Sequence, residues 1–177
     1  RYSVLIVIGL TILLTALYLP PQGVGRLSFN LGGYRGIYNS AWVGATVTIL
    51  TVIFMSLPGF YLVKNAISRD ERTGVGQIIA TAPTSKLVYV LGKWLSNLAV
   101  LALILGIMTA MAVVMQLVRA EDTTIRLGAM IATVWLMGLP VLAIAAALAV
   151  LFECTPLLSG GFGNVVFFFL WLSGLIV

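Results

Sequence analysis

The longest polar segment of this chain reads Lys64-Asn-Ala-Ile-Ser-Arg-Asp-Glu-Arg-Thr-Gly-Val-Gly-Gln-Ile-Ile-Ala-Thr-Ala-Pro-Thr-Ser-Lys-Leu-Val-Tyr-Val-Leu-Gly-Lys93. It is a polar island in a chain that is otherwise strongly apolar, and it holds seven of the 15 charged residues (10 Lys and Arg, 5 Asp and Glu). A charge left in hydrocarbon costs several kcal/mol. We therefore expect this segment to lie at a water face and to form a docking surface.

The composition of the whole chain is that of a membrane protein. Of the 177 residues, 61% are hydrophobic and 8% are charged, whereas a soluble domain carries about 25% charged residues. The net charge of +5 comes from basic residues that flank apolar stretches, which favours contact with anionic lipid headgroups over nucleic acid. The chain has no histidine and one cysteine, so we expect no intrachain disulfide, no metal and no cofactor.

Five stretches without charge are each long enough to contain a helix that crosses a bilayer, which takes about 20 apolar residues. We therefore predict an all-α polytopic bundle of transmembrane helices, with spans at residues 3–19, 41–63, 94–118, 127–151 and 162–177. The chain begins with Arg and stops inside an apolar run. We expect residues 1–177 to be a single transmembrane domain that is truncated at both ends.

Two features of the apolar stretches predict packing and orientation. The fourth expected span carries a run of small residues that allows close helix packing, at Ala143, Ala145, Ala146, Ala147 and Ala149. The side that holds residues 64–93 has six basic residues, against four on the opposite side. By the positive-inside rule, the N-terminus and residues 64–93 are predicted to be cytoplasmic.

Within the polar island, residues 65–82 have the pattern of an amphipathic helix. An apolar stripe follows helical spacing at Val75, Ile78, Ile79 and Ala82. Gly74 and Gly76 each weaken a helix by about 1 kcal/mol, so a break or a close backbone approach is expected there. Pro83 ends the helix, and Thr84 or Ser85 caps a second one that starts near residue 86 and enters the third span. The alternative to a docking role is an inert helix at the membrane interface.

The island resembles one known family, on residues that run from Glu71 to Lys93. Its Glu71-Arg72-Thr73-Gly74-Val75, Thr81-Ala82-Pro83 and Leu91-Gly92-Lys93 are similar to the pattern of type-2 ATP-binding-cassette (ABC) permeases. Two departures are Val75, where that family usually has Thr, and Ala82, which separates Thr81 from Pro83. The order of elements is also similar, with two spans before the polar segment and further spans after it. That family usually has six spans, so the resemblance implies one span beyond the five that the sequence shows.

This resemblance implies a permease subunit of the plasma membrane that moves a substrate by alternating access. Its partners would be a cytosolic ATP-binding-cassette ATPase, a second permease subunit and membrane lipid. By the same resemblance, export is favoured over import. The segment between spans two and three is the coupling helix that contacts the ATPase in that family. The resemblance therefore implies that the residues in contact with the ATPase are Arg69, Asp70, Glu71, Arg72, Gly74, Ile78 and Pro83.

The sequence offers little support for an enzymatic function. Gly92-Lys93 does not fit a nucleotide-binding loop, because Leu87 and Trp94 occupy the positions that would need Gly and Ser or Thr. We therefore expect no ATP site and no enzymatic activity in this chain. Glu153 borders the fourth span, where a capping or snorkelling acid is favoured over a proton carrier. A stand-alone secondary transporter or channel is the second hypothesis, and it usually needs ionisable groups at midspan.

Overall fold

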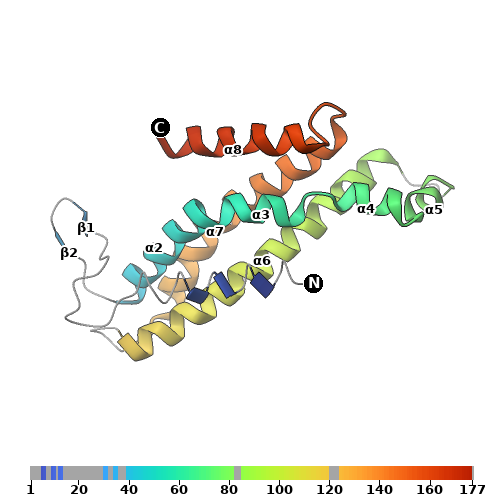
Figure 1. Ribbon diagram of the computed structural model, residues 1–177. Coiled ribbons are helices and arrows are strands. Elements are labelled where there is room, and N and C mark those ends of the chain that lie inside the picture. The colour runs from blue at the N-terminus through green and yellow to red at the C-terminus, as the bar shows by residue number, and fades with distance from the viewer. Residues whose placement is uncertain are drawn as a thin grey trace. The chain divides into compact units, whose positions relative to one another are not determined.

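The computed structural model describes residues 5–6, 9–10, 12–13, 30–31, 34–35, 39–81, 85–119 and 124–176. Most of these are helical (Figure 1), and the others form the connections between helices and a short antiparallel pair, β1 (Asn30–Leu31) with β2 (Tyr34–Arg35). The helices are α2 (Ser40–Leu50), the π-helical turn η1 (Thr51–Met55), α3 (Ser56–Val63), α4 (Ala66–Arg72), α5 (Val75–Thr81), α6 (Lys86–Arg119), α7 (Leu127–Cys154) and α8 (Gly161–Ile176). The all-α prediction is confirmed in this form.

Three helical runs among the described residues are long and apolar enough to cross a membrane, namely Ser40–Arg72, Lys86–Val118 and Leu127–Cys154. They contain the predicted spans 41–63, 94–118 and 127–151, and they indicate a membrane protein. The 16 residues of α8 reach about 24 Å, which is short of the roughly 30 Å hydrocarbon core. The span at 162–177 therefore stays a prediction, and the one at 3–19 lies largely outside the described residues.

The described helices group into two compact units, the first of which contains residues 1–55 and 103–141. In this unit α2 approaches α7 closely at Gly44, where an added Cβ would lie 3.3 Å from the Met130 backbone. Thr48 donates to its own helix and also to the carbonyl of Thr133 at 3.2 Å. Small and β-hydroxyl residues are what permit such close packing between apolar helices.

The second unit contains residues 56–102 and 142–177, and its core lies between α3 and α8. Phe60 stacks on Phe167 with ring centroids 3.5 Å apart, and Phe152 meets Phe60 edge to face. At one end of the contact the indole of Trp171 donates to the Ser56 hydroxyl at 2.9 Å. These contacts align α3 and α8 in opposite directions, as Figure 1 shows.

The opposite end of the α3–α8 contact is fixed by Lys64, which is only 3% exposed. Its ammonium donates to the side-chain oxygen of Asn164 at 2.6 Å and to the carbonyls of Leu158 and Gly160 at 3.3 and 3.2 Å. A buried cation needs such partners, because desolvation is costly. The expectation that the whole polar island faces water is therefore wrong at Lys64, which is turned inward.

The alanine run of α7 packs as the sequence predicts. Ala145, Ala146 and Ala149 are buried, with exposed fractions of 4% or less. Small side chains on one helix face let a neighbouring helix approach. Ala147 lies on another face of α7, which is exposed.

Candidate functional site

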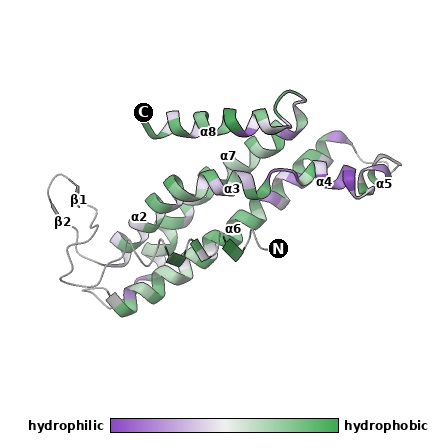
Figure 2. Cartoon of the chain, in the orientation of Figure 1, coloured by the Kyte–Doolittle hydropathy of each residue, from purple (hydrophilic) through white to green (hydrophobic). Residues whose placement is uncertain are grey.

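The α4–α5 segment, Ala66–Thr81, is where the charged residues of the polar island gather. Figure 2 shows α4 as strongly hydrophilic, whereas α2, α6, α7 and α8 are mostly hydrophobic. The two short helices meet at Gly74, whose φ of +76° is in the left-handed region. Glycine adopts this conformation without strain, which explains why the predicted helix over 65–82 divides here. The predicted break is thus confirmed.

The second helix packs against the first immediately after this turn. A Cβ added at Gly76 would lie 3.6 Å from the carbonyl oxygen of Asp70, which is ordinary contact distance. The following helix α6 begins at Lys86, and the Ser85 hydroxyl oxygen accepts from the Val88 amide at 3.3 Å. Ser85 therefore has the capping role that the sequence predicts. Pro83 and Thr84 lie outside the described residues.

The start of α4 is capped from α7 and not by its own neighbour. Asn65 precedes the helix in a left-handed conformation (φ 74°), and its side chain makes no capping hydrogen bond. Instead the Glu153 carboxylate accepts from the amides of Ala66 and Ile67 at 3.1 and 2.5 Å. A carboxylate at a helix N-terminus satisfies unpaired amides and meets the positive end of the helix dipole. The capping interpretation of Glu153 is confirmed.

The middle of α4 is fastened to α6 by an ion pair. The ammonium of Lys93 lies 2.6 Å from an Asp70 carboxylate oxygen, and these side chains are 22% and 15% exposed. The Tyr89 hydroxyl donates to the same oxygen at 2.9 Å, and Lys93 also reaches the carbonyl of Ala66 at 3.4 Å. Because several groups converge and solvent is partly excluded, this contact is stronger than an isolated surface pair.

The residues that hold α4 against α6 were not identified as a set from the sequence; they are Asp70, Tyr89 and Lys93. Tyr89 and Lys93 are four residues apart on α6 and so share a helix face, which is a signal for a common target. Nothing local indicates that this target is Asp70. Asp70 was expected to contact a partner protein, but the structure pairs it within the chain.

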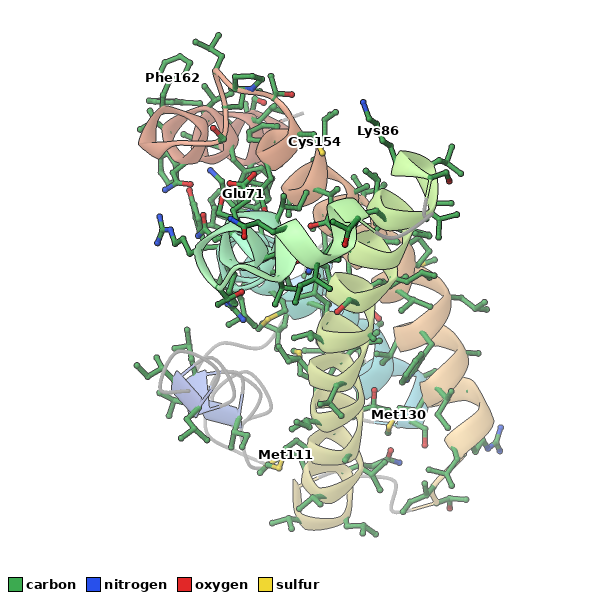
Figure 3. All side chains as sticks on the ribbon, turned by 90° about the vertical axis from the view of Figure 1, so that its right-hand side faces the viewer. Glu71, Lys86, Met111, Met130, Cys154 and Phe162 are labelled. Atoms are coloured by element: carbon green, nitrogen blue, oxygen red, sulfur yellow. The ribbon has the colours of Figure 1, made fainter. Side chains whose placement is uncertain are left out.

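The remaining predicted contact residues are placed differently. Arg69, Glu71 and Arg72 are exposed on α4, and Figure 3 labels Glu71. On α5, Val75 and Ile78 are 42% and 71% exposed. This set of five residues, here termed the docking face, combines charge with unpartnered apolar surface. Gly74 forms the turn beside it.

Within the part of the chain that the structure describes, no three His, Cys, Asp or Glu side chains cluster closely enough to hold a metal ion. The docking face offers guanidinium, carboxylate and aliphatic groups, which suit a polar protein interface with an apolar anchor. Of its two helices, α4 is attached to α6 through Lys93 and to α7 through Glu153, within the second unit. A force applied to α4 therefore reaches both of those helices.

The sequence pattern that resembles type-2 ABC permeases runs from Glu71 to Lys93, and its described residues lie at the end of α4, on α5 and at the start of α6. The described parts of this pattern contribute both an exposed acid and an internal anchor, at Glu71 and Lys93. No protein-family model, no curated protein and no solved structure matches this chain.

Proposed function

We propose that this chain is the membrane-spanning permease subunit of an ATP-binding-cassette transporter. A separate cytosolic ATPase docks on Arg69, Glu71 and Arg72 of α4 and on Val75 and Ile78 of α5. A second permease subunit completes the translocation path in the plasma membrane. Closure of the ATPases on ATP pushes α4, and the path opens to the other side, in the direction of export.

The observation that carries this proposal is the attachment of α4 to two long apolar helices. Glu153 of α7 holds the first amides of α4, and Lys93 of α6 holds Asp70. A loosely tethered surface helix would absorb a push by bending at its ends. A helix fixed at its start and its middle passes the displacement on, which is the property that a coupling element needs.

The exposed side of the segment supports a protein partner. Four of the seven charged residues of the island are exposed, whereas Lys64, Asp70 and Lys93 are used internally. On the neighbouring helix α5, the Ile78 side chain is 71% exposed. Exposed apolar and charged residues on one segment suit an interface that buries the apolar residue and forms ion pairs at its rim.

The alternative of a stand-alone secondary transporter or channel gains little from the buried charges. Among the described residues these are Lys64 and Glu153. Both lie at helix ends, and both are hydrogen-bonded to backbone groups. Neither has the midspan position or the open coordination of an ion or proton carrier.

The orientation is tested by labelling cysteines with a membrane-impermeant maleimide in a Cys154→Ser background. Gln77 of α5 and Arg126 before α7 are both exposed. Gln77→Cys is expected to react only after cell lysis, and Arg126→Cys already in intact cells, because the basic asymmetry places residues 64–93 inside. The reverse pattern would remove the cytoplasmic docking surface.

The docking role is tested with Glu71→Lys. The tagged chain is purified from its native membranes, and the ATP-hydrolysing subunit that co-purifies is measured. Reversing one charge of an interfacial pair is expected to lower recovery of that subunit at least about tenfold. Arg126→Glu, an equal charge reversal outside the polar island, serves as the control and keeps wild-type recovery. Unchanged recovery with Glu71→Lys would leave the segment as an inert interfacial helix.

A further inference from the structure

An apolar groove runs between α6 and α7 within the second unit, away from the docking face. Its volume is about 750 Å³, and its walls include Leu91, Trp94, Ala147, Leu151 and Cys154. The one nitrogen in these side chains, the indole N–H of Trp94, is already bonded to the carbonyl of Ala143 at 3.0 Å. The groove therefore offers almost nothing for a polar ligand to bind, and it suits hydrocarbon.

Side chains on the walls of the groove remain exposed and are not buried by packing within the protein. Ile144 and Leu151, both on α7, are 61% and 56% exposed. The groove follows α7 from residue 144 to residue 154, which is about 15 Å along the helix axis. This length corresponds to half of the hydrocarbon core, and so to the depth of one leaflet.

A positively charged side chain, that of Lys86, lies near the end of the groove at which α6 begins. Lys86 is the first residue of α6, is exposed, and forms no hydrogen bond or ion pair with any residue that the structure describes. Val90, one turn later and about 6 Å further along the axis, is the first groove residue on α6. Figure 3 shows Lys86 and Cys154 at the same end of α6 and α7.

We propose that this groove binds one anionic phospholipid from the adjacent leaflet. An acyl chain fills the space between α6 and α7, and the phosphate of the headgroup pairs with the Lys86 ammonium. The spacing matches that of a lipid, since the charge lies one helical turn above the start of the apolar wall. A second protein helix would fill the groove as well, but it would supply a counterion to Lys86 only if it carried an acid at the matching position. The site is independent of the proposed ATPase docking.

Native mass spectrometry of the purified full chain tests this assignment. The chain is presented with equal amounts of phosphatidylglycerol and phosphatidylcholine that carry the same acyl chains. One lysine near a phosphate favours the anionic lipid about fivefold. Lys86→Ala is expected to abolish that preference. Arg126→Ala removes one charge elsewhere and is expected to keep it.

A second pair of variants tests the groove itself. Ala147→Phe places a ring in the groove and is expected to lower retention of both lipids, whereas Leu136→Phe changes an equally lipid-accessible position of α7 outside it and leaves retention unchanged. Lys86→Ala with a wild-type preference, or Ala147→Phe with wild-type retention, would overturn the proposal. So would efficient joining of two chains by a short thiol cross-linker at Cys154, because a second copy would then cover the groove.

Discussion

Glu153→Lys is expected to release the start of α4 from α7. The native carboxylate is only 9% exposed and accepts from two backbone amides. A lysine cannot accept these bonds, and it places a cation against the positive end of the helix. Breaking a buried charged contact costs about 3–5 kcal/mol, so the amides of Ala66 and Ile67 should exchange with solvent at least about a hundredfold faster.

Hydrogen exchange followed by mass spectrometry of the peptide that covers α4 measures this effect. Glu71→Lys is the matched control, because it makes the same charge change on the exposed face of the same helix. It should lose the partner subunit while keeping wild-type exchange at Ala66. Glu153→Gln retains one acceptor oxygen and should fall between. Native exchange rates in Glu153→Lys would mean that α4 is held by another contact.

Lys93→Glu is expected to detach the middle of α4 from α6. The change replaces an ion pair of 2.6 Å with two carboxylates that face each other, in a place where both native side chains are less than a quarter exposed. We expect a loss of about 2–3 kcal/mol, which corresponds to roughly 30- to 150-fold faster exchange in α4.

The charge-swapped variant Asp70→Lys with Lys93→Glu separates this pair from a general loss of stability. If the two side chains act through each other, the double variant should recover most of the protection that the single variants lose. Additive losses in the double variant would show that the pair does not hold α4. Tyr89→Phe removes only the hydrogen bond to Asp70 and is expected to change exchange by less than about tenfold.

Features that depend on neighbouring residues were predictable from the sequence. The break at Gly74 follows from the weakness of glycine in a helix, and the start of α6 follows from Ser85, two residues after Pro83. The three long apolar runs follow from hydropathy alone. Each of these needs no knowledge of what the segment touches, which is why the boundaries of α4, α5 and α6 agree with expectation.

Features that depend on distant residues were only partly predictable. Glu153 could be assigned a capping role from its place at the end of a span, but its target at Ala66 could not. Asp70 was assigned to the docking surface from the family resemblance, and nothing in the seven residues of α4 identifies Lys93 of α6 as its partner. Lys64 was assigned to water because it belongs to the polar island, and its partners could not be foreseen, since they lie in the connection to α8 and on α8, 94 to 100 residues later.

The two contacts that hold α4 can form only in a fixed order while the chain is being synthesised. Asp70 and Lys93 emerge from the ribosome close together, whereas Ala66 and Glu153 are 87 residues apart. At about 5–20 residues per second, Glu153 is synthesised roughly 4 to 17 s after Ala66. Between the synthesis of Lys93 and that of Glu153, α4 can be attached to α6 alone, and its first amides remain uncapped. The synthesis of α7 therefore completes the segment, and a chain that stops before Glu153 carries an α4 fastened at one point only.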